Sequence, residues 1–294
     1  MNKISQYLQL KEKDSLDNNA VLQILEISHE MRSGKLSFQE VFSETKQFFV
    51  SEIDENRLKA IRLIRFLLLR NLQMINHEEF KAIFNFFIDK IKDIILIEET
   101  IQIILILLDF SSIWQLKTPA FEDAMKQFLC LFSNNFIFFL PAYNQKVRLS
   151  VLKILEIYLD QKIEDFEQKK QFLSTFLNQI EGEKDPRNLL KILTLIKRIL
   201  DTFEEKLINE RKIEIFDLLD CYYPISFNKP KNLKVTIEGE DLEEALNSCL
   251  FHKVLYDKSW TFLLEKLNSG VLESQIAGLI SIKYILSVIF LDFS

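Results

Sequence analysis

Apolar side chains recur at helical spacing along almost the whole of this chain, in segments separated only by brief polar breaks. Several of these segments share one layout, in which a polar or acidic opening is followed by closely spaced apolar positions; they lie at 54–68, 98–108, 143–159 and 185–200. Their starts fall roughly 40–46 residues apart, a period typical of stacked two-helix repeats. A single helical pair cannot bury its apolar face, so neighbouring pairs must stack and share one core.

The composition agrees with a helical array and disfavours an α/β enzyme. Hydrophobic residues make up 48% of the chain, whereas it holds only 5 glycines and 5 prolines in 294 residues. Phosphate loops and the turns of α/β enzymes need many glycines, and no long strand of period two is visible. The sequence therefore predicts an all-α, HEAT/armadillo-like α-α superhelical solenoid, with residues 1–294 forming a single array.

Helix boundaries follow from the polar breaks and their capping residues. Ser37, Asp54 and Asn76 are predicted to cap helices, and Pro119 is predicted to occupy a first helical position. Gly34 is predicted to end the first clear helix. The predicted helices are 18–33, 37–50, 54–68, 76–91, 94–110, one from Pro119, 144–159, 164–180, 186–203, 206–220, 240–251, 259–267 and 271–292.

Charge and hydropathy exclude two classes of partner. The net charge is −6, which argues against nucleic acid as the main ligand, because phosphate binding needs an excess of Lys and Arg. The two most apolar stretches, 94–110 and 278–293, contain charged residues and fall short of about 20 uncharged residues. Both are predicted to be helices buried on all sides, and no signal peptide or membrane contact is expected.

Neither the cysteines nor the histidines have the spacing of a metal or cluster site. Cluster ligation needs about four converging thiolates, and no CxxC pair occurs. The residues in question are Cys130, Cys221, Cys249, His29, His77 and His252. The cysteines are predicted to be buried and structural, His77 is predicted to start a helix, and no metal or cofactor is expected.

No catalytic constellation is visible either. The chain lacks a GxSxG nucleophile motif and a phosphate-binding glycine loop. Three pairs of adjacent acidic residues, at 98–99, 204–205 and 243–244, are predicted to belong to solvated helix faces, because neighbouring residues on a helix point about 100° apart. The sequence therefore predicts no enzyme activity.

The repeat period breaks between 221 and 239, where we expect an inserted loop within one repeat. Four apolar side chains in it, Tyr222, Tyr223, Ile225 and Phe227, either tuck against the solenoid or form a partner-binding tip. The lysines that follow, Lys229, Lys231 and Lys234, add positive charge that suits an acidic partner.

The segment KDPRNLL at 184–190 has two interpretations. In the structural one, Asp185 caps a helix, Pro186 fits its first turn, and Arg187 reaches an acidic residue of a neighbouring repeat. In the functional one, the segment is an exposed rim that contacts partner proteins. The candidate partner-binding residues are Lys184, Asp185, Arg187, Tyr222, Tyr223, Phe227, Lys229 and Lys231.

A few segments and their order carry a family resemblance. EGEKDPRNLL at 181–190, CYYPISFNKP at 221–230 and GEDLEEAL at 239–246 resemble the amino-terminal part of the methyl-methanesulfonate-sensitivity nineteen family. The segment 260–286 is similar to that family's next repeat, and 67–93 is more weakly similar. Departures include the short lysine-bearing loop after Pro230 and Gln275, where the family usually has a lysine.

The resemblance implies a function that the residues alone do not. The family is the HEAT-repeat targeting subunit of the cytosolic iron–sulfur protein assembly machinery. A member would act as an adaptor that brings apo-proteins of DNA replication and repair, such as helicases and polymerases, to the cluster-loading complex. The implied partners are the other subunits of that complex and those clients, in cytoplasm and nucleus. The alternatives are a HEAT-repeat adaptor of another complex, in transport or phosphatase assembly, and a protein that itself binds a cluster or metal.

Overall fold

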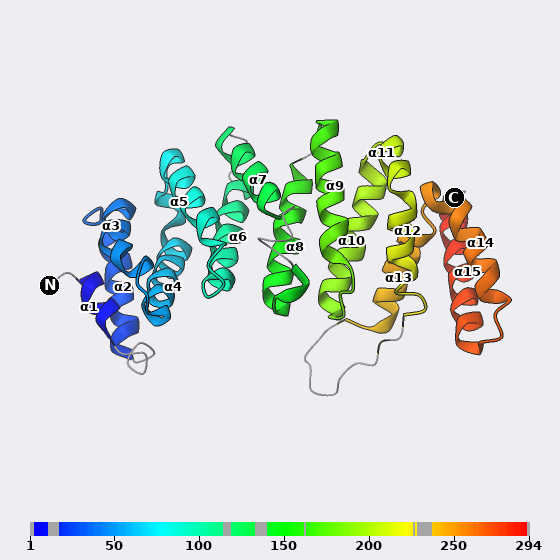
Figure 1. The fold of residues 1–294 in the computed structure, drawn as a ribbon, viewed down its shortest axis with the longest axis horizontal. Coiled ribbons are helices and arrows are strands. Elements are labelled where there is room, and N and C mark those ends of the chain that lie inside the picture. The colour runs from blue at the N-terminus through cyan, green and yellow to red at the C-terminus, as the bar shows by residue number, and fades with distance from the viewer. Residues whose placement is uncertain are drawn as a thin grey trace. The chain divides into compact units, whose positions relative to one another are not determined.

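The computed structural model describes residues 3–10, 18–113, 119–132, 140–161, 163–225, 227 and 237–292. Within these residues it contains helices and no strand, which confirms the all-α prediction (Figure 1). The α-helices are α1 (Lys3–Gln9), α2 (Asn18–Arg32), α3 (Phe38–Phe49), α4 (Asp54–Asn71), α5 (His77–Lys90), α6 (Ile97–Ile113), α7 (Pro119–Phe132), α8 (Gln145–Asp160), α9 (Phe166–Ile180), α10 (Pro186–Thr202), α11 (Glu205–Glu210), α12 (Lys212–Asp220), α13 (Gly239–Leu250), α14 (Tyr256–Leu267) and α15 (Leu272–Asp292). Short 3-10 helices are η1 (Leu72–Met74), η2 (Leu140–Ala142) and η3 (Lys253–Leu255).

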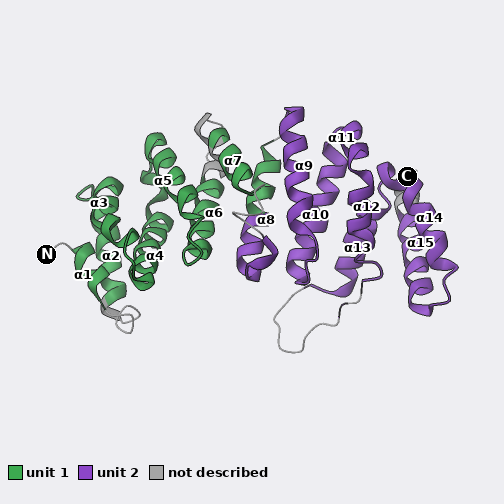
Figure 2. Ribbon diagram, in the orientation of Figure 1, with its two compact units in different colours: residues 1–139, 153–162 green, residues 140–152, 163–294 purple. Residues whose placement is uncertain are grey.

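The chain divides into two compact units, which Figure 2 colours separately. Unit 1 comprises residues 1–139 and 153–162, and unit 2 comprises 140–152 and 163–294. In unit 1, α2, α4 and α6 follow one another in one layer, while α3 packs on α4 and α5 packs on α6 and α7. In unit 2, α13 packs against α10, α12 and α15, and α14 pairs with α15. This pairwise packing is that of a HEAT-type array.

Contacts between equivalent positions of neighbouring repeats agree with the predicted period. In unit 1 the Ser28 hydroxyl donates to Oδ1 of Asn71, 43 residues on, at 3.4 Å. In unit 2 the Gln145 amide donates to Oδ1 of Asn188, again 43 residues on, at 3.0 Å. The repeat length read from the sequence therefore sets which side chains meet across the stack.

Most predicted helix starts are confirmed, and one cap is corrected. Ser37 and Asn76 form capping boxes with Glu40 and Glu79, and His77 and Pro119 are first helical residues. Asp54 is not a cap: it is the first residue of α4 and makes an ion pair of 2.8 Å with Arg57. The Asp54 carboxylate thus binds the Arg57 side chain, one helical turn later, and not a backbone amide.

Two further elements differ from the prediction. The single helix expected at 206–220 is broken at Arg211, whose backbone leaves the helical region (φ −120°, ψ 12°). Its guanidinium binds Glu214 and the Ser174 hydroxyl of α9, and this ties the break to the neighbouring repeat. Helix α1 was not expected; it buries Ile4, Tyr7 and Leu8.

The two membrane-like segments behave differently. Helix α6 is buried, with Ile101, Ile103, Ile104, Leu107 and Leu108 all inaccessible, because it is enclosed by α4 and α5. Helix α15 packs on α13 and α14, but it contradicts the prediction of burial on all sides, because Leu272, Ile276, Leu279 and Leu286 are exposed. None of the helices in the described residues is long and apolar enough to cross a membrane.

Candidate functional site

The loop from α9 to α10 is built around a buried carboxylate, that of Glu183. Gly182 turns the chain there with φ +75°, a conformation that favours glycine. The Arg148 guanidinium of α8 grips Glu183 with two hydrogen bonds, of 2.7 Å from Nε and 2.8 Å from Nη2. The amides of Lys184 and Asp185 also donate to Glu183 Oε1, both at 2.9 Å.

Asn188 completes the connection between the starts of α8 and α10. It is fully buried, donates to Glu183 at 3.0 Å and accepts from Gln145. Arg148 in turn donates to the carbonyl of Tyr143 at 2.6 Å. We call Gln145, Arg148, Glu183 and Asn188 the 148–183 network; it satisfies its own polar groups and joins two neighbouring repeats.

The pKa values in the network follow from this geometry. Burial by itself raises the pKa of Glu183, but the hydrogen bonds from Arg148, the Asp185 amide and Asn188 outweigh it, and the pKa lies below its usual range. The same bond to Glu183 raises the pKa of Arg148. Both groups are therefore held in their charged forms, so this is a structural ion pair and not a proton-transfer pair.

Segment 184–190 starts α10 as predicted, with one correction. Asp185 caps the helix by accepting from the Arg187 amide at 3.0 Å, and Pro186 follows in the first turn. Arg187, however, does not reach a neighbouring repeat. Its guanidinium folds back onto Asp185 at 2.9 and 2.7 Å, because the capping carboxylate is the nearest anion.

The second signature segment meets the first at Tyr222. Its hydroxyl is shielded from solvent and lies against the backbone of Glu183, and burial raises its pKa to about 12. KDPRNLL and CYYPISF, separated by some thirty residues, thus come together at one place.

Tyr223 anchors the start of the 221–239 loop on the other side. Its ring packs edge-on against Phe262 of α14 with centroids 5.0 Å apart, and its hydroxyl lies 3.1 Å from Oγ of Ser281. Ser281 donates to Asn247 at 2.8 Å. Two of the loop's aromatic residues therefore fold back against the helices, which favours the tucked interpretation for Tyr222 and Tyr223.

The remaining candidate residues are not all brought together. Lys184 is exposed, while Asp185, Arg187, Tyr222, Tyr223 and Phe227 are partly exposed. Lys229, Lys231 and the neighbouring Lys234 lie outside the described residues. We call Lys184, Asp185, Arg187, Tyr222 and Tyr223 the rim.

Reasoning from sequence missed Arg148 and Glu183. Both residues lie among other charged and polar residues near predicted helix starts, so the sequence suggests that they are simply exposed to solvent. A signal was nonetheless present, because Glu183 lies two residues before the capping Asp185 and Arg148 lies four residues after the polar Asn144. The two residues therefore flank the starts of consecutive helices of the set, although they are not equivalent positions of the 43-residue repeat.

Two of the three cysteines depart from the prediction that they are buried. Cys249 is buried, as predicted, and burial raises its pKa to about 12. Cys130 and Cys221 are exposed, which contradicts the prediction. Cys130 lies on the outward side of α7, whose Leu129 and Phe132 face inward. In the described residues no group of three or more His, Cys, Asp or Glu is arranged to hold a metal ion.

Glu99 is likewise not on a solvated face. Its carboxylate makes ion pairs of 3.1 Å with Arg62 and of 3.1 Å with Arg65 of α4, and the side chain is only 13% exposed. This ion pairing joins α4 to α6 as the 148–183 network joins α8 to α10.

Comparison with known proteins gives the family. Residues 43–288 match the MMS19 amino-terminal family, described as a Dos2-interacting transcription regulator of RNA-Pol-II. The MMS19 nucleotide excision repair protein homolog of Dictyostelium discoideum is 26% identical over 96% of this chain and 24% of its own length. The DNA repair/transcription protein MMS19 of Saccharomyces cerevisiae is 29% identical over 79% of the chain and 22% of its own length. The chain thus spans about a quarter of these relatives, and it belongs to the MMS19 family, whose amino-terminal region it represents.

Proposed function

We propose that this chain is part of a non-catalytic HEAT-repeat adaptor of the cytosolic iron–sulfur assembly targeting complex. In this role it helps to deliver iron–sulfur clusters to apo-proteins of DNA replication and repair, such as helicases and polymerases, in cytoplasm and nucleus. The observation that carries the proposal is the match to the MMS19 family over residues 43–288. Relatives named for DNA repair and transcription support the client class.

The charge distribution at the rim supports a role in protein binding. Lys184 is exposed and its backbone amide is bound by Glu183, and the partly exposed Tyr222 lies against the backbone of Glu183. Rigidly held aromatic and basic side chains are typical of protein interfaces. We propose the rim, together with Phe227, Lys229 and Lys231, as a contact for acidic surfaces of partner proteins.

The test is co-purification of the tagged chain from cells, followed by identification of the bound proteins. The proposal expects iron–sulfur assembly factors and apo-clients among them. Lys184→Glu should reduce their recovery, whereas Lys253→Glu, which reverses an equally exposed lysine in η3, should not. Recovery of transport or phosphatase subunits in place of iron–sulfur factors favours the alternative adaptor instead.

A metal analysis separates the adaptor from a protein that itself binds a cluster. Protein purified without oxygen is expected to carry no stoichiometric iron. Iron that stays bound through purification, and is lost when Cys130 and Cys221 are both changed to serine, contradicts the adaptor proposal.

We also propose that residues 1–294 form one array and that 221–239 is an insert within one repeat. Limited proteolysis tests this, since an insert is cut before the helical pairs that flank it. First cleavage is expected near Lys229–Lys234. Equal resistance of that stretch and of α10 contradicts a projecting insert.

A further inference from the structure

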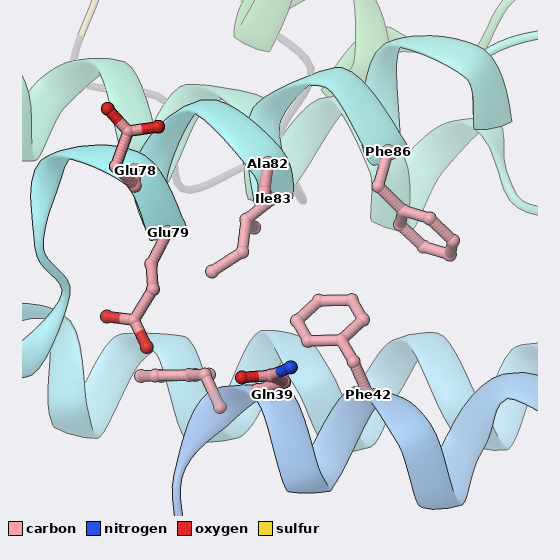
Figure 3. Close-up of a pocket in the computed structure, with 8 residues that line it drawn as sticks. Gln39, Phe42, Glu78, Glu79, Ala82, Ile83 and Phe86 are labelled. Carbon is pink, nitrogen blue, oxygen red and sulfur yellow. The ribbon is translucent and has the colours of Figure 1, made fainter.

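Helices α3 and α5 of unit 1 contact each other through phenylalanine rings. Phe86 packs edge-on against Phe42 and Phe49, with centroids 5.4 and 5.0 Å apart. From these rings toward the starts of the two helices runs a groove of about 430 Å³. The groove (Figure 3) is lined by Phe38, Gln39, Phe42, Glu78, Glu79, Ala82, Ile83 and Phe86.

The floor of the groove is apolar and held in place. Ile83 is 4% exposed and Phe38 is also 4% exposed, so both belong to the core as well as to the groove. In Figure 3, Phe42 and Phe86 face each other across the gap while Ala82 and Ile83 point into it. Because Ala82 is small and exposed, it leaves the space above Ile83 open.

The two ends of the groove carry opposite charge. Figure 3 shows the carboxylates of Glu78 and Glu79 at the end away from Phe42 and Phe86. Beyond the phenylalanines, the Lys90 ammonium lies 5.4 Å from the centre of the Phe86 ring and 5.8 Å from that of Phe49. A peptide lying along the groove therefore has the carboxylates of Glu78 and Glu79 at one end and the Lys90 ammonium at the other.

The acidic end attracts cations and not anions, although two helices begin there. A helix start normally offers free amides and partial positive charge to an anion. Here the amides of Glu40 and Glu79 are already bound by Ser37 Oγ at 3.2 Å and Asn76 Oδ1 at 3.0 Å. Each start therefore offers one fewer free amide, and the negative charges of Glu78 and Glu79 beside it favour a cation.

We propose that this groove docks an amphipathic helix of a partner protein, with apolar side chains between Phe42, Ile83 and Phe86 and a Lys or Arg against Glu78. The volume lies within the range of about 300–1,000 Å³ of specific binding pockets, and a trough between two helices suits the helix-in-groove mode. A second copy of this chain is a poorer occupant, because its net charge is −6. The inference rests on the proposed adaptor role, since it names one surface by which such an adaptor holds a protein.

Selection from a displayed library of random peptides tests the groove with the purified full chain. Peptides of about 15 residues, roughly four helical turns, are selected on the wild-type chain and then measured individually. The expected binders carry apolar residues at i, i+4 and i+7 and basic residues toward one end. Ala82→Arg, which fills the groove, should weaken them by about tenfold or more.

Matched variants separate the groove from general effects of charge. Ser43→Arg adds the same charge at an exposed position of α3 that does not line the groove, and it should leave the affinity within about twofold. Glu78→Lys should weaken binding several-fold, with a smaller loss at high salt. Circular dichroism and urea unfolding establish that each variant is folded.

The outcomes discriminate between occupants and between proposals. Selected peptides that are acidic, or that bind Ala82→Arg as well as wild type, overturn the inference, as does a selection that yields no binder. Concentration-dependent dimerisation of the chain that Ala82→Arg abolishes assigns the groove to a second copy and also overturns it. Co-purification of iron–sulfur factors is measured separately. Failure of the adaptor role is therefore seen as loss of those factors, and failure of the groove is seen in the peptide measurements.

Discussion

Neighbouring repeats are joined in two physically different ways in this molecule. Between α3 and α5, phenylalanine rings meet at one end and leave an open groove at the other. Between the starts of α8 and α10, the 148–183 network joins the repeats through hydrogen bonds and a buried ion pair. Apolar contacts are non-directional and tolerate a gap beside them, whereas a buried charge requires every partner to be in place. We therefore propose that the first joint binds a partner helix, while the second joint holds the rim rigidly in place.

Removing a ring from the apolar joint should have the largest effect on stability. Phe87 is fully buried and contacts Phe42 and Phe86. Phe87→Ala is expected to lower the free energy of unfolding by about 3–5 kcal/mol, which urea unfolding followed by circular dichroism measures. The loss should be the same in low and high salt. A loss under about 1 kcal/mol would mean that α5 relaxes into the cavity.

Breaking the polar joint should cost slightly less. Arg148→Ala leaves the Glu183 carboxylate, only 5% exposed, without its cation, at an expected cost of about 3 kcal/mol. Arg187→Ala is the control, because Arg187 pairs with Asp185 at the surface and should cost less than about 1 kcal/mol. Equal effects of the two changes contradict a structural role for the network.

The two joints should also differ in their response to acid. The folded-state pKa of Glu183 lies below the ordinary value of 4.5, so its contribution is complete above that value and is lost as pH falls through the folded pKa. Urea unfolding at about pH 7 and about pH 3 brackets the ordinary range of a glutamate. Glu183→Gln should flatten this dependence and Phe87→Ala should leave it unchanged. An unchanged slope in Glu183→Gln assigns the acid sensitivity to other carboxylates.

Loss of a helix cap beside the groove should have the smallest effect. Asn76→Ala removes the bond to the Glu79 amide, and the expected cost is about 1 kcal/mol. Gln73→Ala, at an exposed position of η1, serves as control. Hydrogen exchange should become faster only in the first turn of α5. Faster exchange throughout α5 would show that the cap stabilises the whole helix.

Local signals in the sequence predicted the helices well, because each depends on a few neighbouring residues. Ser37, Asn76 and Asp185 cap as expected because their side chains bind amides two or three residues on. Helix α1 was missed because its seven residues hold too few periods to reveal an apolar face. The interruption at Arg211 depends on Ser174 of another repeat, which no local window contains.

Contacts across repeats were the harder part of the site. Arg187 was expected to reach a neighbouring repeat, yet Arg148 does so, because the exact register of stacked helices decides which of two nearby arginines faces Glu183. The groove depends on how α3 and α5 lie beside each other, and side chains from both helices line it. These helices pack against α4 and α6, so the local sequence pattern alone does not encode the groove.

The most direct test of this division of roles is hydrogen–deuterium exchange of the chain, free and bound to the partner recovered with it. We predict new protection along α3 and α5, while the starts of α8 and α10, where the amides of Asp185 and Arg187 are already hydrogen-bonded, are protected in the free protein as well. Rapid exchange at the starts of α8 and α10 in the free chain contradicts the rigid polar joint. Protection confined to unit 2 outside the rim contradicts the assignment of binding to the apolar joint.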